Sequence, residues 1–349
     1  MKYKKLGDSG IDVSLICLGT MTWGEQNTQE DAFAQMDYAL ERGVNFWDTA
    51  EMYPVPVKQE TSRTTEKIIG NWIEKTGRRA EIVLATKIIG RSDRKWMRGG
   101  VLPKLNREQI FQAVDDSLGR LKTDYIDLYQ IHWPNRPLGL FGEGNGSYVH
   151  KTDFSDIPIA ETMDALDEVV RSGKVRTIGI SNETPWGVSQ YLTAASNGKH
   201  KIASIQNSYS LINRVYEGGL SEFAYRDNIG LLAYSPLAMG SLSGKYIEGN
   251  RPKNSRMGLF PDFMTRYQTA AAEKAIRQYA ELSKDYGLTP TELALGFVNT
   301  RPFVTANIIG ATTLAQLKEN IDTVDISISE ELEEKIRLIH LECKNPAAA

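Results

Sequence analysis

Cysteine and histidine are scarce in this chain. Its 349 residues include two cysteines, Cys17 and Cys343, which stand at opposite ends of the sequence. Such distant thiols fit the reduced side chains of a cytoplasmic protein better than a disulfide framework. The four histidines never approach an H-E-x-x-H pattern, and the cysteines form no zinc-binding pair. We therefore expect no metal centre.

Long apolar runs and an excess of charge of one sign are also missing. No segment approaches the ~20 apolar residues of a membrane helix, and residues 1–7 lack the apolar stretch of a signal peptide. Forty-one Lys and Arg stand against forty-four Asp and Glu, a net charge of −3. This balance gives no electrostatic case for nucleic acid or an acidic membrane as a partner. We expect a cytoplasmic protein, and the sequence leaves its oligomeric state open.

Two glycine-rich nucleotide motifs are absent as well. No G-x-G-x-x-G follows the first predicted strand, so the Rossmann fingerprint is missing. Residues 240–246 hint at a P-loop, but the segment is one residue short and lacks Ser or Thr after Lys245.

Short β-rich runs alternate with amphipathic stretches along the whole chain. A hairpin is predicted over residues 3–6 and 11–14, and helices over 28–42, 65–75 and 159–171. Eight apolar runs have the character of buried parallel strands: 15–19, 44–48, 82–87, 126–132, 175–181, 202–207, 230–235 and 304–310. Eight strand–helix units in one domain, residues 1–349, favour a closed (β/α)₈ TIM barrel with an N-terminal β-hairpin, the alternative being an open doubly wound sheet.

Two long connections follow predicted strands. Residues 133–158 and 236–267 are rich in Gly and Pro, and both leave the carboxyl end of a strand. Either segment alone is as compatible with ordinary surface structure as with a binding loop. Because both lie on the face where TIM barrels carry their active sites, we expect long βα loops with a functional role.

Four polar residues stand at or just beyond the ends of the second, third and fourth predicted strands. They are Asp48, Tyr53, Lys87 and His132. Singly, each is more simply explained as a cap, a surface charge or a polar strand end. In a barrel, however, strand ends converge on one mouth, so the four side chains are expected to meet.

Such a group suits proton donation to a carbonyl oxygen. A tyrosine hydroxyl with a pKa of about 10 is a poor acid, and a neighbouring ammonium lowers that pKa. A carboxylate holds the ammonium in place, and a histidine can orient the substrate carbonyl. None of these side chains supplies two electrons, so a hydride reduction requires a cofactor.

The order of the motifs resembles the aldo-keto reductase family. The similarity runs through residues 18–21, 48–53, Lys87, 129–132, 179–182, 206–210, 234–237 and 309–311. Residues 19–26 and 51–56 look most like the bacterial Tas-type reductases, a branch related to the potassium-channel β-subunits. The resemblance implies a (β/α)₈ barrel and NADPH-dependent reduction of aldehydes or ketones, with a small carbonyl compound as substrate.

Residue roles carried over from the resemblance follow position by position. Tyr53 matches the family's proton donor, Asp48 and Lys87 the pair that tunes it, and His132 the carbonyl-orienting residue. Ser181, Asn182 and Gln206 match the positions at the nicotinamide amide, and Tyr234 the ring-stacking position. Lys245 and Arg256 match basic positions near the adenosine phosphate, which favours NADP over NAD. The remaining implied cofactor-binding positions are Thr20, Met21, Gln26, Asp48, Ser235, Pro236, Leu237, Ala238, Met239, Gly310, Thr312, Gln316, Glu319 and Asn320.

Two other functions remain open at this point. A non-catalytic NADPH-binding regulatory subunit is possible by analogy with the channel β-subunits, but these commonly carry Asn where this chain has His132. A barrel hydrolase would use two carboxylates, for which Asp48 and Glu51 are the candidates. For the substrate pocket, we expect walls from Trp23, Tyr53, Trp133 and the segments 54–62 and 136–157. Phe263 and Met264 are expected to lie over the cofactor.

Overall fold

Eight parallel strands close into a barrel. The computed structural model describes residues 1–349 except 142, 144–147, 152–155, 264 and 349. Neighbouring strands follow the order β10-β3-β4-β5-β6-β7-β8-β9, which excludes the open sheet. The strands are β3 (Ile16–Gly19), β4 (Phe46–Asp48), β5 (Val83–Ile88), β6 (Ile126–Ile131), β7 (Val175–Ser181), β8 (Ile202–Ser208), β9 (Gly230–Tyr234) and β10 (Val304–Ile309).

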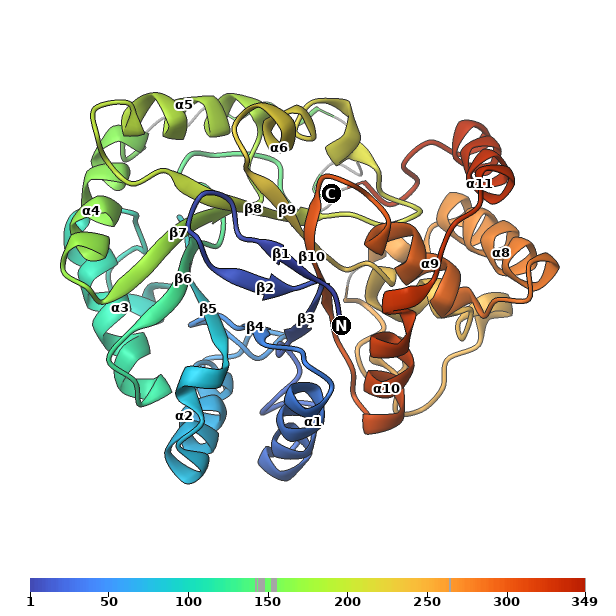
Figure 1. Cartoon of the computed structure of the whole chain (residues 1–349), viewed down its shortest axis with the longest axis horizontal. Coiled ribbons are helices and arrows are strands. Elements are labelled where there is room, and N and C mark those ends of the chain that lie inside the picture. Colours follow the sequence, from blue (N-terminus) through green and yellow to red (C-terminus); the bar gives the residue numbers. More distant parts are fainter. Residues whose placement is uncertain (142, 144–147, 152–155, 264, 349) are drawn as a thin grey trace.

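Helices surround the barrel (Figure 1). Local sequence signals set where several of them begin: Thr28 forms a capping box with Asp31, and Thr289 forms one with Glu292 ahead of a proline in the first turn. The helices are α1 (Gln29–Glu41), α2 (Thr64–Thr76), α3 (Arg107–Leu121), α4 (Ile159–Arg171), α5 (Pro185–Ala195), α6 (Glu222–Arg226), α7 (Arg256–Leu259), α8 (Ala270–Asp285), α9 (Pro290–Asn299), α10 (Leu314–Asp322) and α11 (Glu330–Glu342).

A short hairpin covers the amino-terminal end of the barrel. Strands β1 (Tyr3–Lys5) and β2 (Asp12–Ser14) lie across the ring of strands in Figure 1. Leu6 and Val13 are fully buried and pack with Phe46 and Leu232 from the barrel strands. Gly7 has a positive φ, and a Cβ there would lie 2.5 Å from the Ala203 carbonyl oxygen. The hairpin therefore seals one end of the barrel and leaves the opposite end for the long loops.

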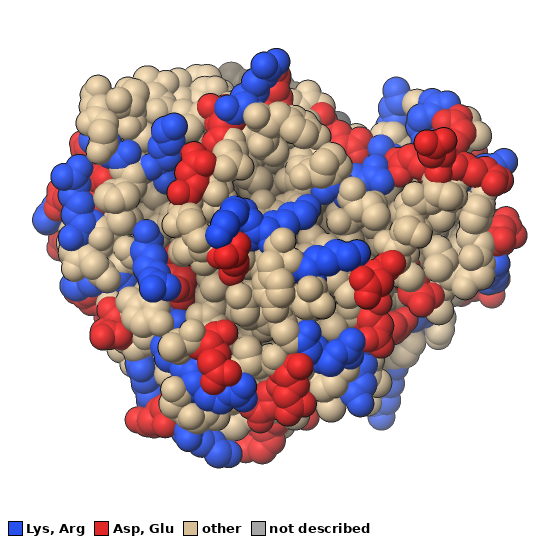
Figure 2. Space-filling view, in the orientation of Figure 1, with Lys and Arg blue, Asp and Glu red and all other residues tan. Residues whose placement is uncertain are grey.

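Charges are mixed on the face that carries the hairpin. Figure 2 shows Lys and Arg interspersed with Asp and Glu over most of this face. Two hairpin lysines form ion pairs there, Lys5 with Asp12 and Lys2 with Asp325. Among the described residues, no helix combines the length and hydrophobicity of a membrane span.

The long segment after β9 is more structured than an irregular loop. Within residues 236–267 the chain forms η5 (Ala238–Ser243), η6 (Ile247–Gly249), α7 (Arg256–Leu259) and η7 (Thr265–Gln268). Short helical turns of this kind carry no extended hydrophobic periodicity, which is why sequence patterning does not reveal them. The segment η7 packs against both η5 and α8, so it lies at the carboxyl-terminal mouth of the barrel.

Candidate active site

Strand register brings the predicted polar residues together. Asp48 ends β4, Lys87 lies near the end of β5, and Lys87 is directly opposite Gln130 of β6. Gln206 of β8 is paired in register with Ser181 of β7. Because parallel strands end on the same side of the barrel, these side chains share one mouth.

The Asp48 carboxylate is the centre of a buried polar network. One oxygen accepts a hydrogen bond from the Lys87 ammonium at 2.6 Å. The other oxygen accepts bonds from the Gln130 and Gln206 amides at 3.1 and 2.9 Å. Lys87 also donates to the Thr49 carbonyl oxygen at 2.8 Å. These four hydrogen bonds hold the carboxylate and the ammonium in position.

Tyr53 lies against this network. The Lys87 nitrogen is 5.0 Å from the centre of the Tyr53 ring. Burial raises the pKa of Tyr53, and the nearby Lys87 charge and hydrogen bond oppose that rise without overcoming it. The net shift is upward because desolvation is the larger effect. The direction of the Lys87 contribution itself agrees with the expectation.

Burial and neighbouring charges also shift the pKa values of Lys87 and His132. Burial lowers the pKa of Lys87, but Asp48 and Tyr53 outweigh burial, so the net shift is upward and the ammonium stays charged. Burial lowers the pKa of His132 well below its ordinary value, and the Lys87 charge lowers it further. The His132 imidazole is therefore neutral at physiological pH. Its ring lies edge-on to Tyr53, with centroids 5.7 Å apart.

A cavity of about 1110 Å³ opens at this mouth. Asp48, Tyr53 and His132 line it, whereas Lys87 lies behind them and does not. Most of the expected cofactor-binding residues line it too: Thr20, Met21, Ser181, Asn182, Gln206, Tyr234, Ser235, Pro236, Leu237, Met239, Lys245, Arg256, Gly310, Thr312, Gln316, Glu319 and Asn320. Gln26 and Ala238 do not line the cavity. Ala238 is fully buried, and Gln26 instead contacts Arg256.

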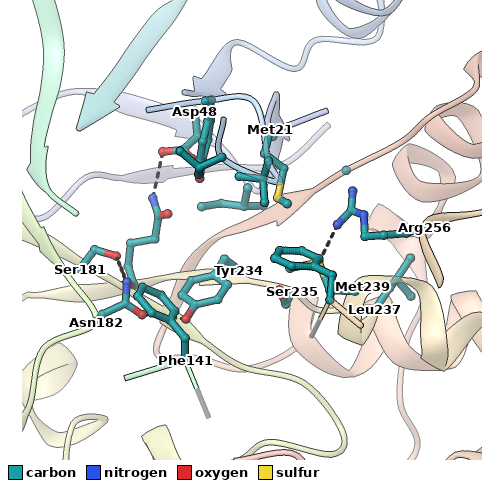
Figure 3. Close-up of a pocket in the computed structure, with 18 of the residues that line it drawn as sticks. Met21, Asp48, Phe141, Ser181, Asn182, Tyr234, Ser235, Leu237, Met239 and Arg256 are labelled. Atoms are coloured by element: carbon teal, nitrogen blue, oxygen red, sulfur yellow. Dashed lines mark hydrogen bonds between the residues drawn. The ribbon is translucent and has the colours of Figure 1, made fainter. Parts of the chain in front are cut away.

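Tyr234 stands midway along the cavity. In Figure 3 it lies between Ser181 and Asn182 on one side and Ser235, Met239 and Arg256 on the other. Its hydroxyl donates to the Asn182 side chain at 2.7 Å. Asn182 in turn donates to the His132 carbonyl oxygen at 2.8 Å and to the Ser181 hydroxyl at 3.0 Å. These bonds link the aromatic ring to the end of the cavity that holds His132.

The chain after Tyr234 has an unusual backbone. Ser235, Ala238, Met239 and Gly240 all have φ between +49° and +94°. Left-handed conformations are unfavourable for Ala, Ser and Met, and such strain clusters at ligand sites. The Lys245 ammonium lies close to this turn: a Cβ atom, which Gly240 lacks, would be only 2.8 Å from the Lys245 nitrogen. The turn and this lysine form one wall of the cavity.

Two cations of this wall have no acidic partner. Arg256 contacts the Met239 sulfur and the Gln26 amide oxygen, and Lys245 lies over the Tyr246 ring. Within the described part of the chain, neither forms an ion pair with a carboxylate. Burial lowers the pKa of Arg256. Residues of α10 and of the chain just before it also line the cavity: Thr312 donates to Gln316, and Asn320, in the last turn of the helix, donates to the Gly310 carbonyl oxygen.

Three buried polar residues escape sequence reasoning. Gln130 lies in the motif at 129–132, and its signal is a polar side chain in a mostly apolar strand. Arg98 forms two hydrogen bonds with the Glu51 carboxylate, at 2.9 and 2.6 Å. Arg266 lines the cavity although it is 5% exposed. Arg98 and Arg266 lie in short helical turns, so no extended periodicity marks them.

Other expectations about the pocket have mixed outcomes. Trp23 is fully buried beside Gln35 and is not a wall of the cavity, which corrects that expectation. Trp133 and Phe263 line the cavity, and Met264 lies outside the described residues. Glu51 also accepts a bond from the Ile89 backbone and does not line the cavity, so it cannot pair with Asp48 as a hydrolase requires. The part of the chain that the structure describes contains no cluster of metal-binding side chains.

Comparison with known proteins gives a consistent picture. Residues 15–339 match the family model described as "Aldo/keto reductase family". Protein tas of Escherichia coli is 44% identical over 99% of this chain and 100% of its own length. Versiconal hemiacetal acetate reductase of Aspergillus parasiticus is 29% identical, covering 95% of this chain and 94% of its own. A probable voltage-gated potassium channel subunit beta of Arabidopsis thaliana is 30% identical, covering 93% and 92%.

Proposed function

The chain belongs to the aldo/keto reductase family, and we propose that it is an NADPH-dependent oxidoreductase that reduces aldehydes or ketones to alcohols. The observation that carries the proposal is the meeting of Asp48, Lys87, Tyr53 and His132 at one end of a large cavity. A phenol, an ammonium and a neutral imidazole provide an acid, a fixed charge and a hydrogen-bond donor. These are the groups that reduction of a carbonyl requires.

Tyr53 is the proton donor in this proposal. Its raised pKa keeps the hydroxyl protonated before the reaction. As the carbonyl oxygen gains negative charge, the hydroxyl proton moves to it, and the phenolate left behind is stabilised by the Lys87 ammonium. Asp48 keeps that ammonium charged and in place through the 2.6 Å bond. Gln130 and Gln206 hold Asp48 and act as positioning residues.

His132 orients the carbonyl. A neutral imidazole has one N–H donor and one acceptor nitrogen. The low pKa of His132, caused by burial and by Lys87, keeps the ring in this neutral form. Because His132 and Tyr53 line the same cavity with their rings in edge contact, both can address one carbonyl oxygen.

The cavity residues fit a nicotinamide dinucleotide. The aromatic ring of Tyr234 suits the nicotinamide ring, and the strained backbone at 235–240 suits the diphosphate. Lys245 and Arg256, which form no ion pair among the described residues, suit a further phosphate. When bound, NADPH supplies the two electrons as a hydride. Ser181, Asn182, Gln206 and Tyr234 would hold its nicotinamide end, and Lys245, Arg256 and the start of α10 its adenosine end.

The two unpaired cations favour NADP over NAD. The 2′-phosphate distinguishes the two dinucleotides and carries close to two negative charges at neutral pH. Arg256 and Lys245 offer two positive charges on one wall of the cavity. We therefore expect tighter binding of NADPH than of NADH.

The substrate end has an apolar character. Trp133 lies 4.9 Å from the His132 ring and 5.9 Å from the Phe141 ring, centroid to centroid, and Leu138 and Leu140 also line this end. Such a wall suits a flat apolar aldehyde. Cys17 and Cys343 are unpaired, which fits a reducing compartment such as the cytoplasm.

The test is a carbonyl-substrate screen with purified protein. Loss of NADPH absorbance with 4-nitrobenzaldehyde, and a weaker rate with NADH, is the expected result. Tight NADPH binding without turnover across a broad panel of aldehydes and ketones would instead support the regulatory-subunit alternative. Absence of any dinucleotide binding would refute both.

A further inference from the structure

Arg266 is a buried cation without an acidic partner. Its Nη2 donates to the Tyr267 hydroxyl at 2.8 Å, and its guanidinium carbon lies 4.7 Å from the centre of the Tyr267 ring. Its Nε and Nη1 atoms are buried and have no hydrogen-bond partner among the residues that the structure describes. Within the described part of the chain, no carboxylate forms an ion pair with it. Two donors of a permanently charged group are therefore left unsatisfied.

The other buried arginines of the molecule differ in this respect. Arg79 and Arg98 are 9% and 6% exposed, comparable to 5% for Arg266. Arg79 pairs with Asp127 at 2.7 Å, and Arg98 pairs with Glu51 at 2.6 Å. A buried charge without a counter-charge is strongly unfavourable, and guanidinium does not deprotonate to escape the cost. Because Arg266 lines the cavity, a ligand in the cavity can supply the missing anion.

The surroundings of Arg266 indicate which anion this is. Arg266 belongs to η7, which packs against η5, the segment that continues the strained turn after Tyr234. Arg266 and Tyr234 line the same cavity, and the charge of Arg266 opposes the rise that burial causes in the pKa of Tyr234. Arg266 thus shares the cavity with the left-handed turn at 238–240, against which its own segment packs.

We propose that Arg266 binds the diphosphate bridge of the dinucleotide, as a charge-assisted contact additional to the strained turn at 235–240. The inference rests on the proposed function, because Tyr234 and Arg256 define the two ends of the bound cofactor. A guanidinium in the cavity wall whose Nε and Nη1 donors have no partner among the described residues suits phosphate oxygens, which arginine binds through paired N–H groups.

The test compares the binding of NADP⁺ and NAD⁺, since both contain the diphosphate and only NADP⁺ contains the 2′-phosphate. Dissociation constants are measured by titration calorimetry for the wild type, Arg266→Met, Arg266→Lys and Arg256→Met. Arg266→Met is expected to weaken both dinucleotides by the same factor, about tenfold to a hundredfold. Arg266→Lys is expected to retain most of the affinity. Arg256→Met is expected to weaken NADP⁺ more than NAD⁺.

Thermal unfolding without dinucleotide separates ligand binding from a structural role. Arg266→Met is expected to melt no lower than the wild type, because it removes an unpaired buried charge. Arg79→Met is the matched control: it breaks a buried ion pair remote from the cavity, and we expect a lower melting temperature with unchanged affinity for both dinucleotides.

Three results would overturn the inference. They are unchanged affinity for both dinucleotides in Arg266→Met, a loss confined to NADP⁺, and a loss confined to the KM of aldehydes that carry a carboxylate. The last result would assign Arg266 to an acidic substrate. If the wild type bound no dinucleotide at all, the proposed function would fail as well. If the wild type bound tightly and Arg266→Met left both dissociation constants unchanged, only the inference about Arg266 would be refuted.

Discussion

The Lys87 ammonium lies 2.6 Å from the Asp48 carboxylate, and the two side chains are 0% and 3% exposed. A buried ion pair of this kind is a weak source of stability, because desolvation of the two charges offsets their attraction. Its consequence here is a fixed positive charge beside Tyr53. The main effect of the pair is therefore on the pKa of the Tyr53 hydroxyl, which the Lys87 charge lowers.

Replacement of Lys87 tests that effect. In Lys87→Met the charge that favours the phenolate is gone, so the pKa of Tyr53 rises further. We expect turnover to fall by about a hundredfold to a thousandfold, because the developing phenolate loses its counter-charge. Any decline of the rate at high pH should also move to higher pH. A pH profile of turnover checks both effects, with Lys4→Met, at the other end of the barrel, as the control. An alkaline limb that stayed in place would contradict the proposed coupling.

The buried His132 makes the stability of the protein depend on pH. In the folded protein its pKa lies well below 6.5, while in the unfolded chain it returns to about that value. Between these two values the unfolded chain binds the extra proton, so stability rises with pH and is lost as the pH falls below about 6.5. Relative to His132→Asn, the wild type should lose about 1.4 kcal/mol per pH unit in this window.

Urea unfolding at a series of pH values measures the difference between these two proteins. Because both contain the same other histidines, their titration cancels in the comparison. Parallel pH dependences for the wild type and His132→Asn would show that the imidazole is not held neutral.

The Glu51–Arg98 pair is expected to be structural. Both side chains are 2% exposed, and Glu51 also accepts a bond from the Ile89 backbone. Removing one partner leaves an uncompensated buried charge, so Arg98→Met should destabilise the fold by about 3–5 kcal/mol. The double variant Glu51→Met/Arg98→Met should lose less than the sum of its single variants, as denaturant unfolding can measure. Lys5→Met, which breaks an exposed pair with Asp12, should cost about 1 kcal/mol or less.

Much of the fold is predictable from the sequence. The helix at 159–171 and the strand at 175–181 have the predicted bounds, because helical periodicity after Pro158 marks the helix and a near-continuous apolar run marks the strand. The closed barrel and the convergence of Asp48, Lys87 and His132 then follow from strand order. Family membership is confirmed, whereas the roles of the site residues remain proposals.

The remaining features depend on tertiary structure that no local pattern encodes. Arg98 and Arg266 lie in short helical turns, and only the fold shows that one has a carboxylate partner while the other has none. Trp23 closely follows Thr20 and Met21, which line the cavity, yet its own side chain is buried in the core. The pKa of Tyr53 reflects a competition between burial and the Lys87 charge, and the extent of burial cannot be known from the sequence.

Tyr53→Phe separates proton donation from every other property of the site. The substitution keeps the aromatic ring and removes the hydroxyl alone. Turnover of 4-nitrobenzaldehyde should fall by at least about a hundredfold, while NADPH binding and the melting temperature stay close to those of the wild type. If the variant reduced the aldehyde at nearly the wild-type rate, Tyr53 would not be the proton donor.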